Sequence, residues 1–480
     1  MNYKMIINIL GWVLIIEAIG MLIPLVCALC YGELTETYIF LISIAICLAL
    51  GFLITRKSPR HKSFFAKEGF VTVALSWIVM SLFGSLPFVI SGFIPNPFDA
   101  FFETVSGFTT TGASILTDVE ILPKSLIMWR SLTHWIGGMG VLVFLMAILP
   151  LSGSSNLFLL RAESPGPSVN KLVPKVRSTA MILYGIYIAM TFIEILLLLG
   201  GGLSLFDSLT LSFGTAGTGG FAILNSGLNS YSPYVQYVIA IFMVLFGIDF
   251  GLYYILFLKE AKSSILKSGE LRCYLAIIAS AVTLILINCR GVFATFEEAF
   301  RNVFFTVASI ITSTGYGTAD YNLWPDFSKS IIVLLMFIGA CAGSTGGGIK
   351  VSRIMILFKS IIKEIRTCAH PRNTIKIKMN GRIVEHETVR GVNVFIAAFA
   401  CIFVAAMLVI SLDNFGFTTN FTAVLATMNN IGPGLDMVGP TGNYAAFSNL
   451  SKLVMSFCML VGRLEIFPML ILFSPYTWRK

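Results

Sequence analysis

Residues 296–321 read FEEAFRNVFFTVASIITSTGYGTADY, and this stretch decides the fold. It begins as an apolar helical run of roughly half the 20 residues that cross a bilayer, and it ends in a cluster of Ser, Thr and Gly. Three more segments share this pattern: FDAFFETVSGFTTTGAS (98–114), LFDSLTLSFGTAGTGGFA (205–222) and FTTNFTAVLATMNNIGPGLDMVGP (417–440). One glycine from each cluster gives spacings of 107, 96 and 117 residues, with the members Gly112, Gly219, Gly315 and Gly432. The pattern predicts four repeats of about 100 residues each.

The composition around these segments is that of a membrane protein. Apolar residues make up 56% of the 480 and charged residues only 12%, against about 25% charged in an average soluble domain. This excludes an ordinary water-soluble enzyme. Stretches long enough to cross a bilayer lie near 5–31, 37–55, 69–93, 125–150, 177–201, 232–258, 272–290, 329–357, 391–412 and 449–475. Ten spans would place both termini on the same side of the membrane.

The basic and acidic residues are distributed unequally among the connections between the predicted spans. Of the 33 Lys and Arg residues, 26 fall in segments that would share one side, namely Lys4, 56–67, 161–177, 259–272, 350–390 and 479–480. Thirteen of the 24 acidic residues fall in the alternate connections. This positive-inside pattern predicts cytoplasmic termini. The net charge of +9 is therefore attributed to topology, and no nucleic acid is expected as a partner.

We therefore predict an all-α polytopic membrane protein of four membrane–pore-helix–membrane repeats around a pseudo-fourfold pore, plus an N-terminal pair of helices. The expected parts are an extra helix pair at 1–55 and repeats at 69–150, 177–258, 272–365 and 391–475. The nine cysteines suggest no disulfide framework, and the C-x-x-C at 27–30 is interpreted as two small membrane residues.

The four loops suggest an ion path. Non-helical backbone at membrane depth is tolerated where it is buried in protein or lines a watery cavity, and a ring of carbonyl groups can replace the water shell of an alkali cation. A half-helix that ends at such a ring directs its partially negative end toward the ion. The alternative is that these are ordinary outer loops with turn-forming glycines. Four matching loops in four repeats favour the pore.

The eighth span is interrupted by GACAGSTGGGIK at 339–350. Three successive glycines weaken a helix by about 1 kcal/mol each, so a break is expected there. A phosphate-binding P-loop is excluded because Ile349 separates Gly348 from Lys350. The alternative to a functional loop is a glycine-rich packing kink against neighbouring helices.

Several charged residues lie inside predicted spans. Arg463 is expected near the middle of the last span, where a charge is a functional candidate by default. Glu465 lies two positions on and would not face it on a helix, and the alternative role for Arg463 is a structural charge paired within the bundle. Arg130 and His134 in WRSLTHW are expected to anchor a helix at the membrane interface. Further charges within spans are Glu17, Glu194 and Asp249.

The sequence resembles the Trk/Ktr/HKT superfamily of potassium transporters, and in it the TrkH-type membrane subunits of bacterial Trk uptake systems. The four loop clusters carry this resemblance, together with WRSLTHWIGGMG (129–140), ESPGP (163–167) and GRLEIF (462–467). The resemblance implies a potassium-binding filter built from Thr110, Thr111, Gly112, Gly217, Thr218, Gly219, Ser313, Thr314, Gly315, Asn430, Ile431 and Gly432. In plant relatives a serine in place of the first-repeat glycine accompanies sodium preference, so the four glycines imply potassium.

The resemblance also implies a gate below the filter, formed by Gly343, Ser344, Thr345, Gly346, Gly347, Gly348, Lys350 and Arg463. It implies a homodimer and a cytosolic regulatory ring of RCK-type domains, which would carry the only nucleotide. Potassium at the filter is the only metal expected, and no cofactor is expected on this chain. The basic segment 350–390 could dock that ring or bind anionic lipid. Asp249 stands where the family leads us to expect Asn.

Two other functions remain in competition at this point. A proton- or sodium-coupled symporter would use Glu194 or Asp249 for coupling and would show two matched unwound segments. A membrane-embedded enzyme would need a clustered nucleophile or metal site, and the sequence shows no such cluster. The expected protein is therefore a transporter of the bacterial cytoplasmic membrane and not an enzyme.

Overall fold

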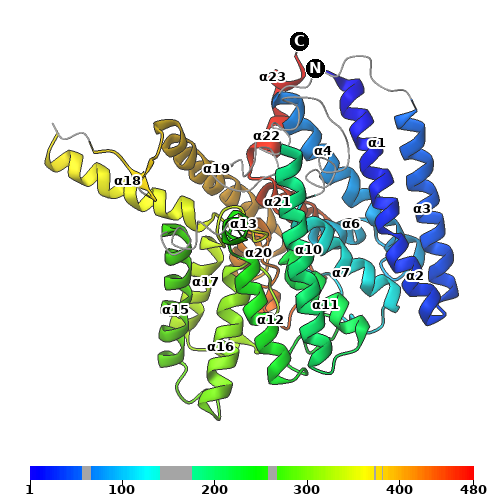
Figure 1. Cartoon of the computed structure of the whole chain (residues 1–480), viewed down its shortest axis with the longest axis horizontal. Coiled ribbons are helices and arrows are strands. Elements are labelled where there is room, and N and C mark those ends of the chain that lie inside the picture. Colours follow the sequence, from blue (N-terminus) through cyan, green and yellow to red (C-terminus); the bar gives the residue numbers. More distant parts are fainter. Residues whose placement is uncertain (57–65, 141–175, 258–267, 372–374, 381, 480) are drawn as a thin grey trace.

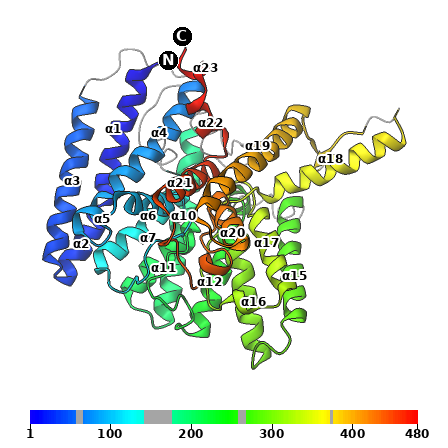
Figure 2. The same ribbon diagram turned by 180° about the vertical axis from the view of Figure 1, so that it is seen from behind.

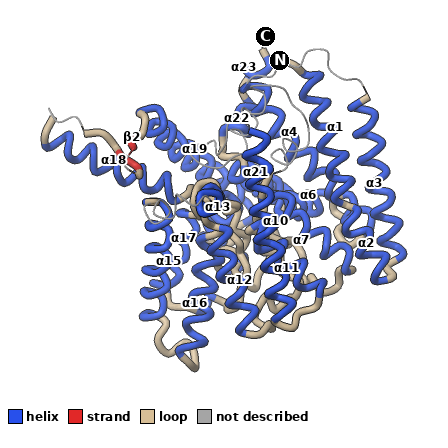
Figure 3. Tube along the Cα trace, viewed as in Figure 1, coloured by secondary structure: helices blue, strands red, loops and turns tan. Residues whose placement is uncertain are grey.

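The computed structural model describes residues 1–56, 66–140, 176–257, 268–371, 375–380 and 382–479. Most of these residues are helical (Figures 1 and 3). Six helical segments are long and apolar enough to cross a membrane, and a seventh candidate is a helix pair bent by 92°. The six lie at Tyr3–Tyr31, Leu34–Thr55, Lys67–Ser91, Ser178–Gly200, Gly269–Asn288 and His386–Asp413. The chain is an all-α multi-pass membrane protein.

The first three helices form the expected N-terminal hairpin at one side of the molecule (Figure 1). They are α1 (Tyr3–Gly20), α2 (Leu22–Tyr31) and α3 (Leu34–Thr55). A Cβ on Gly11 would lie 3.1 Å from the carbonyl oxygen of Gly51, so small residues allow α1 and α3 to approach closely. Such contacts are typical of helix pairs in membranes.

The remaining helices repeat one order: a long helix, a half-length helix and a second helix. The first unit holds α4 (Ala66–Gly84), α5 (Leu86–Ser91), α6 (Pro97–Phe108) and α7 (Lys124–Gly138). The second holds α10 (Val176–Gly200), α11 (Leu205–Gly217), α12 (Pro233–Phe246) and α13 (Phe250–Phe257).

The third unit holds α15 (Gly269–Asn288), α16 (Phe296–Ile311), η1 (Tyr321–Leu323), α17 (Asp326–Ile338) and α18 (Val351–Ala369). The fourth holds α19 (His386–Ile410), η2 (Ser411–Asp413), α20 (Phe417–Met428), η3 (Asp436–Val438), α21 (Asn449–Arg463), α22 (Phe467–Phe473) and α23 (Pro475–Trp478).

The second helix of each unit packs against the half-length helix of the next unit. The contacting pairs are α7 with α11, α12 with α16, α17 with α20, and α21 with α6. Because the fourth pair returns to the first unit, the four units close into a ring in chain order.

The ten predicted spans need one correction, which concerns these second helices. The spans predicted at 232–258 and 449–475 are each broken, between α12 and α13 and between α21 and α22, whereas the break expected at 339–350 is confirmed between α17 and α18. α7 likewise ends at Gly138, and the rest of the 125–150 prediction lies outside the described residues, as does the ESPGP segment. Hydropathy reports composition, so it did not distinguish a continuous helix from two helices separated by a short break, as at 247–249 and 464–466.

One helix leaves the body of the molecule. α18 projects sideways in both Figure 1 and Figure 2, with the short ribbon of β1 (Lys378–Met379) and β2 (Arg382–Ile383) beside it. The two chain termini lie close together, away from α18 (Figure 1).

Candidate ion pathway

Each half-length helix ends in the same hydrogen-bonded cap. In the first unit, Thr110 N–H donates to the carbonyl of Gly107 and Thr111 N–H donates to that of Ser106, at 3.1 and 2.9 Å. This is a Schellman motif, which needs a left-handed residue after the helix. The left-handed residues have φ between 54° and 56°, and they are Thr110, Thr218, Ser313 and Asn430. The four loops thus share one backbone conformation although none of these residues is glycine.

Two positions further on, every loop has a glycine with positive φ, and these glycines face one another around a ring. A Cβ on Gly432 would lie 2.6 Å from the carbonyl oxygen of Thr111 in the first unit. The other three would come still closer to the next unit's carbonyl oxygen, in the pairs Gly112 to Gly219, Gly220 to Thr314, and Gly315 to Ile431. Any side chain at these positions would displace a carbonyl group of the ring.

This geometry shifts the second loop by one residue. The sequence comparison of the repeats paired Gly219 with Gly112 and expected filter atoms from 217–219. The backbone instead pairs Gly220 with Gly112, because Gly220 has φ of 72° and Thr218 is the left-handed cap residue. The segment equivalent to 110–112, 313–315 and 430–432 is therefore 218–220.

The four loops, 109–112, 217–220, 312–315 and 429–432, carry hydroxyl and carbonyl oxygens and no formal charge. Thr109 and Thr111 hydroxyls lie 2.8 Å apart, as do those of Thr312 and Thr314 in the opposite unit. Asn430 Nδ2 donates to the Thr111 hydroxyl at 2.9 Å and so ties the fourth loop to the first. With helix C-termini directed at them, these loops suit a cation.

The glycine-rich loop, residues 339–350, lies against the helix-side ends of the third and fourth loops. A Cβ on Gly346 would be 2.7 Å from the carbonyl oxygen of Thr312, and one on Gly347 would be 3.0 Å from the Cβ of Asn430. The N–H of Gly347 donates to the hydroxyl of Ser313. The glycines allow the loop to touch the ring of loops from the side where α6, α11, α16 and α20 end.

Arg463 is half-buried and reaches two units at once. Its Nη1 donates to the carbonyl of Thr345 at 2.7 Å, and its Nη2 donates to those of Gly137 and Gly138 at 2.6 Å each. Thr345 belongs to the third unit and the two glycines to the first. These are the two neighbours of the fourth unit in the ring, so the guanidinium joins its own unit to both of them. α21 ends at Arg463, which therefore stands at a helix break and not in mid-span.

The glycine-rich loop is held by buried charges. Lys350 is 1% exposed, and its ammonium group donates to the carbonyl of Gly346 in the same loop. Glu270 of α15 accepts the N–H groups of Ala342 at 2.7 Å and Ser352 at 3.2 Å. A carboxylate at the first turn of α18 also favours that helix end.

Two more charged residues, Glu465 and Asp249, make contacts at or next to the glycine-rich loop. Glu465, where the last helix is broken, pairs with Arg353 of α18, and the Arg353 guanidinium lies 4.0 Å from the ring centroid of Phe395. Asp249 accepts the N–H of Gly251 at 2.8 Å, and a Cβ on Gly343 would lie 2.6 Å from its carboxylate. Thus Glu465 has a partner 112 residues away in sequence, a pairing that no local spacing could reveal.

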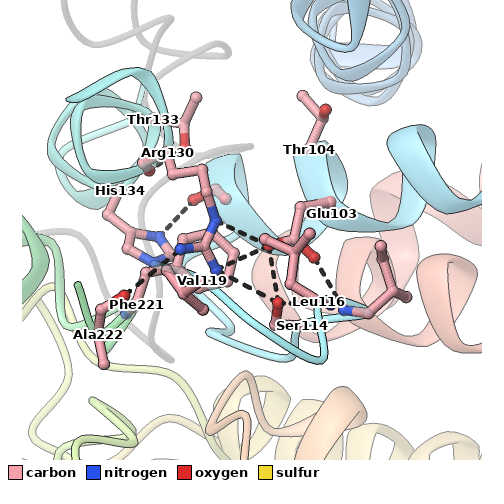
Figure 4. A network of polar contacts seen from close by, with 12 residues as sticks. Glu103, Thr104, Ser114, Leu116, Val119, Arg130, Thr133, His134, Phe221 and Ala222 are labelled. Atoms are coloured by element: carbon pink, nitrogen blue, oxygen red, sulfur yellow. Dashed lines mark hydrogen bonds and ion pairs between the residues drawn. The ribbon is translucent and has the colours of Figure 1, made fainter. Parts of the chain in front are cut away.

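The expectation for Arg130 and His134 was wrong. Both are buried, at 2% and 0% exposed, and they lie behind the first two loops rather than at a membrane interface (Figure 4). Arg130 Nε donates to Glu103 of α6 at 2.9 Å, and Glu103 in turn accepts the N–H of Ile115 at 2.9 Å. From the sequence, Glu103 was counted only among the acidic residues of the outer connections, although its place within an apolar half-helix was a signal of this buried role.

Two other charges singled out in the sequence, Glu17 on α1 and Glu194 on α10, are buried at 2% and 0% exposed. They lie outside the four loops.

A polar cluster on the surface joins the connections that follow the first two loops. There the hydrogen bond from Asn225 Nδ2 to Asp118, 2.7 Å long, holds the pKa of that carboxyl below its usual value.

Known proteins resemble this chain over its whole length. It matches the TrkH family of cation transport proteins over residues 36–479. It is 34% identical to the Trk system potassium uptake protein TrkH of Salmonella typhimurium and 32% identical to TrkG of Escherichia coli K12. These alignments cover all of this chain with 100% and 99% of the relatives. The chain belongs to the TrkH family.

A solved structure agrees with the family assignment. The crystal structure of the potassium transporter TrkH from Vibrio parahaemolyticus superimposes with a TM-score of 0.90 at 31% identity, and each chain is covered fully. This TrkH-family chain is therefore a membrane transport protein and not an enzyme.

Proposed function

We propose that this TrkH-family protein takes up potassium through a filter formed by the four loops. The observation that carries the proposal is the closed ring in which each loop glycine packs against the carbonyl of the next unit. The relatives TrkH and TrkG are potassium uptake proteins, which supports the choice of ion. The filter residues are those predicted from sequence, with Gly220 in place of Gly217 in the second loop.

The chemistry of the loops supports a monovalent ion. Divalent cation sites usually contain carboxylates, whereas these loops supply only carbonyl and hydroxyl oxygens. Four helix C-termini add partial negative charge without a fixed anion that would hold the ion tightly. An ion bound in this way can leave as readily as it enters, as conduction requires. A symporter with two unwound segments fits a fourfold ring less well than a filter does.

We further propose that residues 343–348, Lys350 and Arg463 form the gate. Arg463 places a positive charge beneath the ring, where it hydrogen-bonds to the glycine-rich loop and to the first unit. Passage of a cation would require this guanidinium and the loop to move aside. The contact of Gly346 and Gly347 with the third and fourth loops supports this role.

The remaining parts of the proposal concern arrangement in the cell. The charge distribution supports cytoplasmic termini in the bacterial inner membrane, and the four units support repeats with the predicted boundaries. A homodimer and a cytosolic RCK-type ring are proposed as partners. α18 offers a surface for either one, since Phe358, Ile362 and Ile365 are exposed on this projecting helix. Membrane lipid is the other proposed partner.

A flux assay tests the proposal. Purified protein in liposomes should pass K⁺ in preference to Na⁺, and Gly112→Ser or Gly315→Ser should abolish that preference because each adds a side chain against a ring carbonyl. Flux unchanged by serine at all four ring glycines would refute the filter. A symporter would instead show K⁺ flux that follows an imposed proton or sodium gradient and falls in Glu194→Gln or Asp249→Asn.

A further inference from the structure

The buried imidazole of His134 lies between two candidate filter loops and contacts both. It projects from α7 of the first unit into the second loop (Figure 4). Its Nδ1 is 2.7 Å from the carbonyl oxygen of Gly107, near the end of the half-length helix α6. Its Nε2 is 3.3 Å from the backbone nitrogen of Phe221, which directly follows the ring glycine of the second loop. One side chain thus joins the first loop's helix to the second loop's exit.

The two partners determine which nitrogen of the ring carries the proton. A carbonyl oxygen can only accept a hydrogen bond, so Nδ1 must donate to Gly107. A backbone N–H can only donate, so Nε2 must accept from Phe221. The neutral form protonated at Nδ1 is the single state that satisfies both contacts.

The imidazole of His134 fills the space between its neighbours. The centroids of the His134 and Phe221 rings are 4.2 Å apart. Cβ atoms built on Gly217 and Gly219 would overlap with the backbone and the ring of His134, respectively. A shift of the imidazole therefore moves the second loop, and a shift of the loop moves the imidazole.

The neighbouring ion pair holds the same two loops from behind. The Arg130 guanidinium lies 3.9 Å from the ring centroid of Phe221 and donates to the carbonyl of Ala222 at 3.4 Å. Its Nη2 also donates to the hydroxyl of Ser114, just after the first loop, at 3.3 Å. Arg130 thereby keeps Phe221 against His134.

We propose that His134 is a positioning residue for ion selectivity, which as the Nδ1-protonated imidazole fixes the spacing between the first and second filter loops. This inference rests on the proposed filter function, because His134 would hold the first and second loops of that filter at a fixed position relative to each other. The carbonyl of Gly219 faces the Cβ position of Gly112 across this junction. Loss of the Phe221 contact would free that carbonyl to move.

Two substitutions test the contacts of the two imidazole nitrogens separately. In His134→Asn, the side-chain amide reaches the place of Nδ1 and keeps a donor for Gly107, but Phe221 N–H loses its acceptor. In His134→Gln, the amide oxygen reaches the place of Nε2 and keeps that acceptor. Ile136→Val, on the same helix but away from the loops, is the matched control.

The assay is K⁺ and Na⁺ flux through the purified protein in liposomes. We expect His134→Asn to lower the K⁺/Na⁺ permeability ratio roughly tenfold, the order expected for an unsatisfied buried donor, and His134→Gln to restore most of it. An unchanged ratio in His134→Asn, with the wild type selective, overturns the role of His134 and leaves the filter standing. A wild type that shows no K⁺ preference refutes the filter itself.

A second measurement needs no stable variant. Nitrogen NMR of the wild-type protein labelled with ¹⁵N-histidine should show one histidine that is protonated at Nδ1 and resists exchange with solvent. His370 and His386 are exposed and serve as internal references. Only Nε2-protonated or doubly protonated rings in the spectrum would overturn the proposal.

Discussion

Replacement of Gly432 by alanine, compared with the same replacement at a control glycine, tests whether a side chain displaces a ring carbonyl or merely strains the backbone. The new Cβ would lie 2.6 Å from the carbonyl oxygen of Thr111 and 3.0 Å from that of Gly112. Ordinary contact between such atoms begins at 3.4 Å, and contacts under 3.0 Å essentially never occur. The Thr111 carbonyl must therefore retreat by about 0.4 to 0.8 Å.

The expected effect follows from the loss of one ion contact. A hydrogen bond to a charged group contributes about 1.5–3 kcal/mol, and one carbonyl drawn partly away from an ion should forfeit a comparable share. We expect the K⁺/Na⁺ permeability ratio to fall by a factor of about 5–30, which corresponds to about 1–2 kcal/mol.

Gly291 supplies the control. Its φ is 90° against 92° for Gly432, yet no atom lies within 4 Å of the position its Cβ would occupy. Alanine in the left-handed region costs about 1–2 kcal/mol at either site, so Gly291→Ala should lose about that much stability and Gly432→Ala, which adds the contact with the Thr111 carbonyl, at least as much. Only Gly432→Ala should lose selectivity in the liposome flux assay. Equal selectivity in the two variants would refute the steric argument.

Three further substitutions test the charges around the pathway. Arg463→Ala should raise K⁺ flux about tenfold, because it removes from the proposed pathway a positive charge whose repulsion of a cation is on the order of 1–2 kcal/mol; an unaltered rate would count against the barrier. Glu465→Gln should lower the free energy of unfolding by about 2 kcal/mol, because it leaves the Arg353 guanidinium, 6% exposed, without its anion. Denaturation of the double variant with Arg353→Gln checks this, and strictly additive losses would contradict it. Asp99→Asn should destabilise by about 2 kcal/mol through Lys452, which is 5% exposed and 2.6 Å from it; Lys452→Met in the same chain should recover most of that loss, and no recovery in thermal unfolding would show that Asp99 acts otherwise.

The sequence was sufficient for the parts of the fold that depend on local pattern. The four half-length helices and their loops follow from apolar runs that end in small residues. The glycine-rich break at 339–350 was predicted because three successive glycines disfavour helix locally.

The parts that depend on neighbouring units could not be obtained in this way. Gly219 and Gly220 are adjacent and identical, and it takes the backbone angles and the position of the Thr314 carbonyl in the next unit to show which of them belongs to the ring. The Glu465 pair with Arg353 and the burial of His134 likewise depend on helices that are distant in sequence. A charged residue within an apolar stretch indicates a site, but the sequence does not show which residues that charge contacts.

The ring of four loops belongs to one polypeptide, and this affects how its preference for ions can change. In a pore made of four identical subunits, one codon change alters all four quarters at once. Here a side chain at Gly112 displaces the Gly219 carbonyl of the next unit, while the glycines Gly315 and Gly432 stay unchanged. In the proposed filter, selectivity can therefore change by single steps, each of which alters one junction between two loops and leaves the sequence of the other loops as it was.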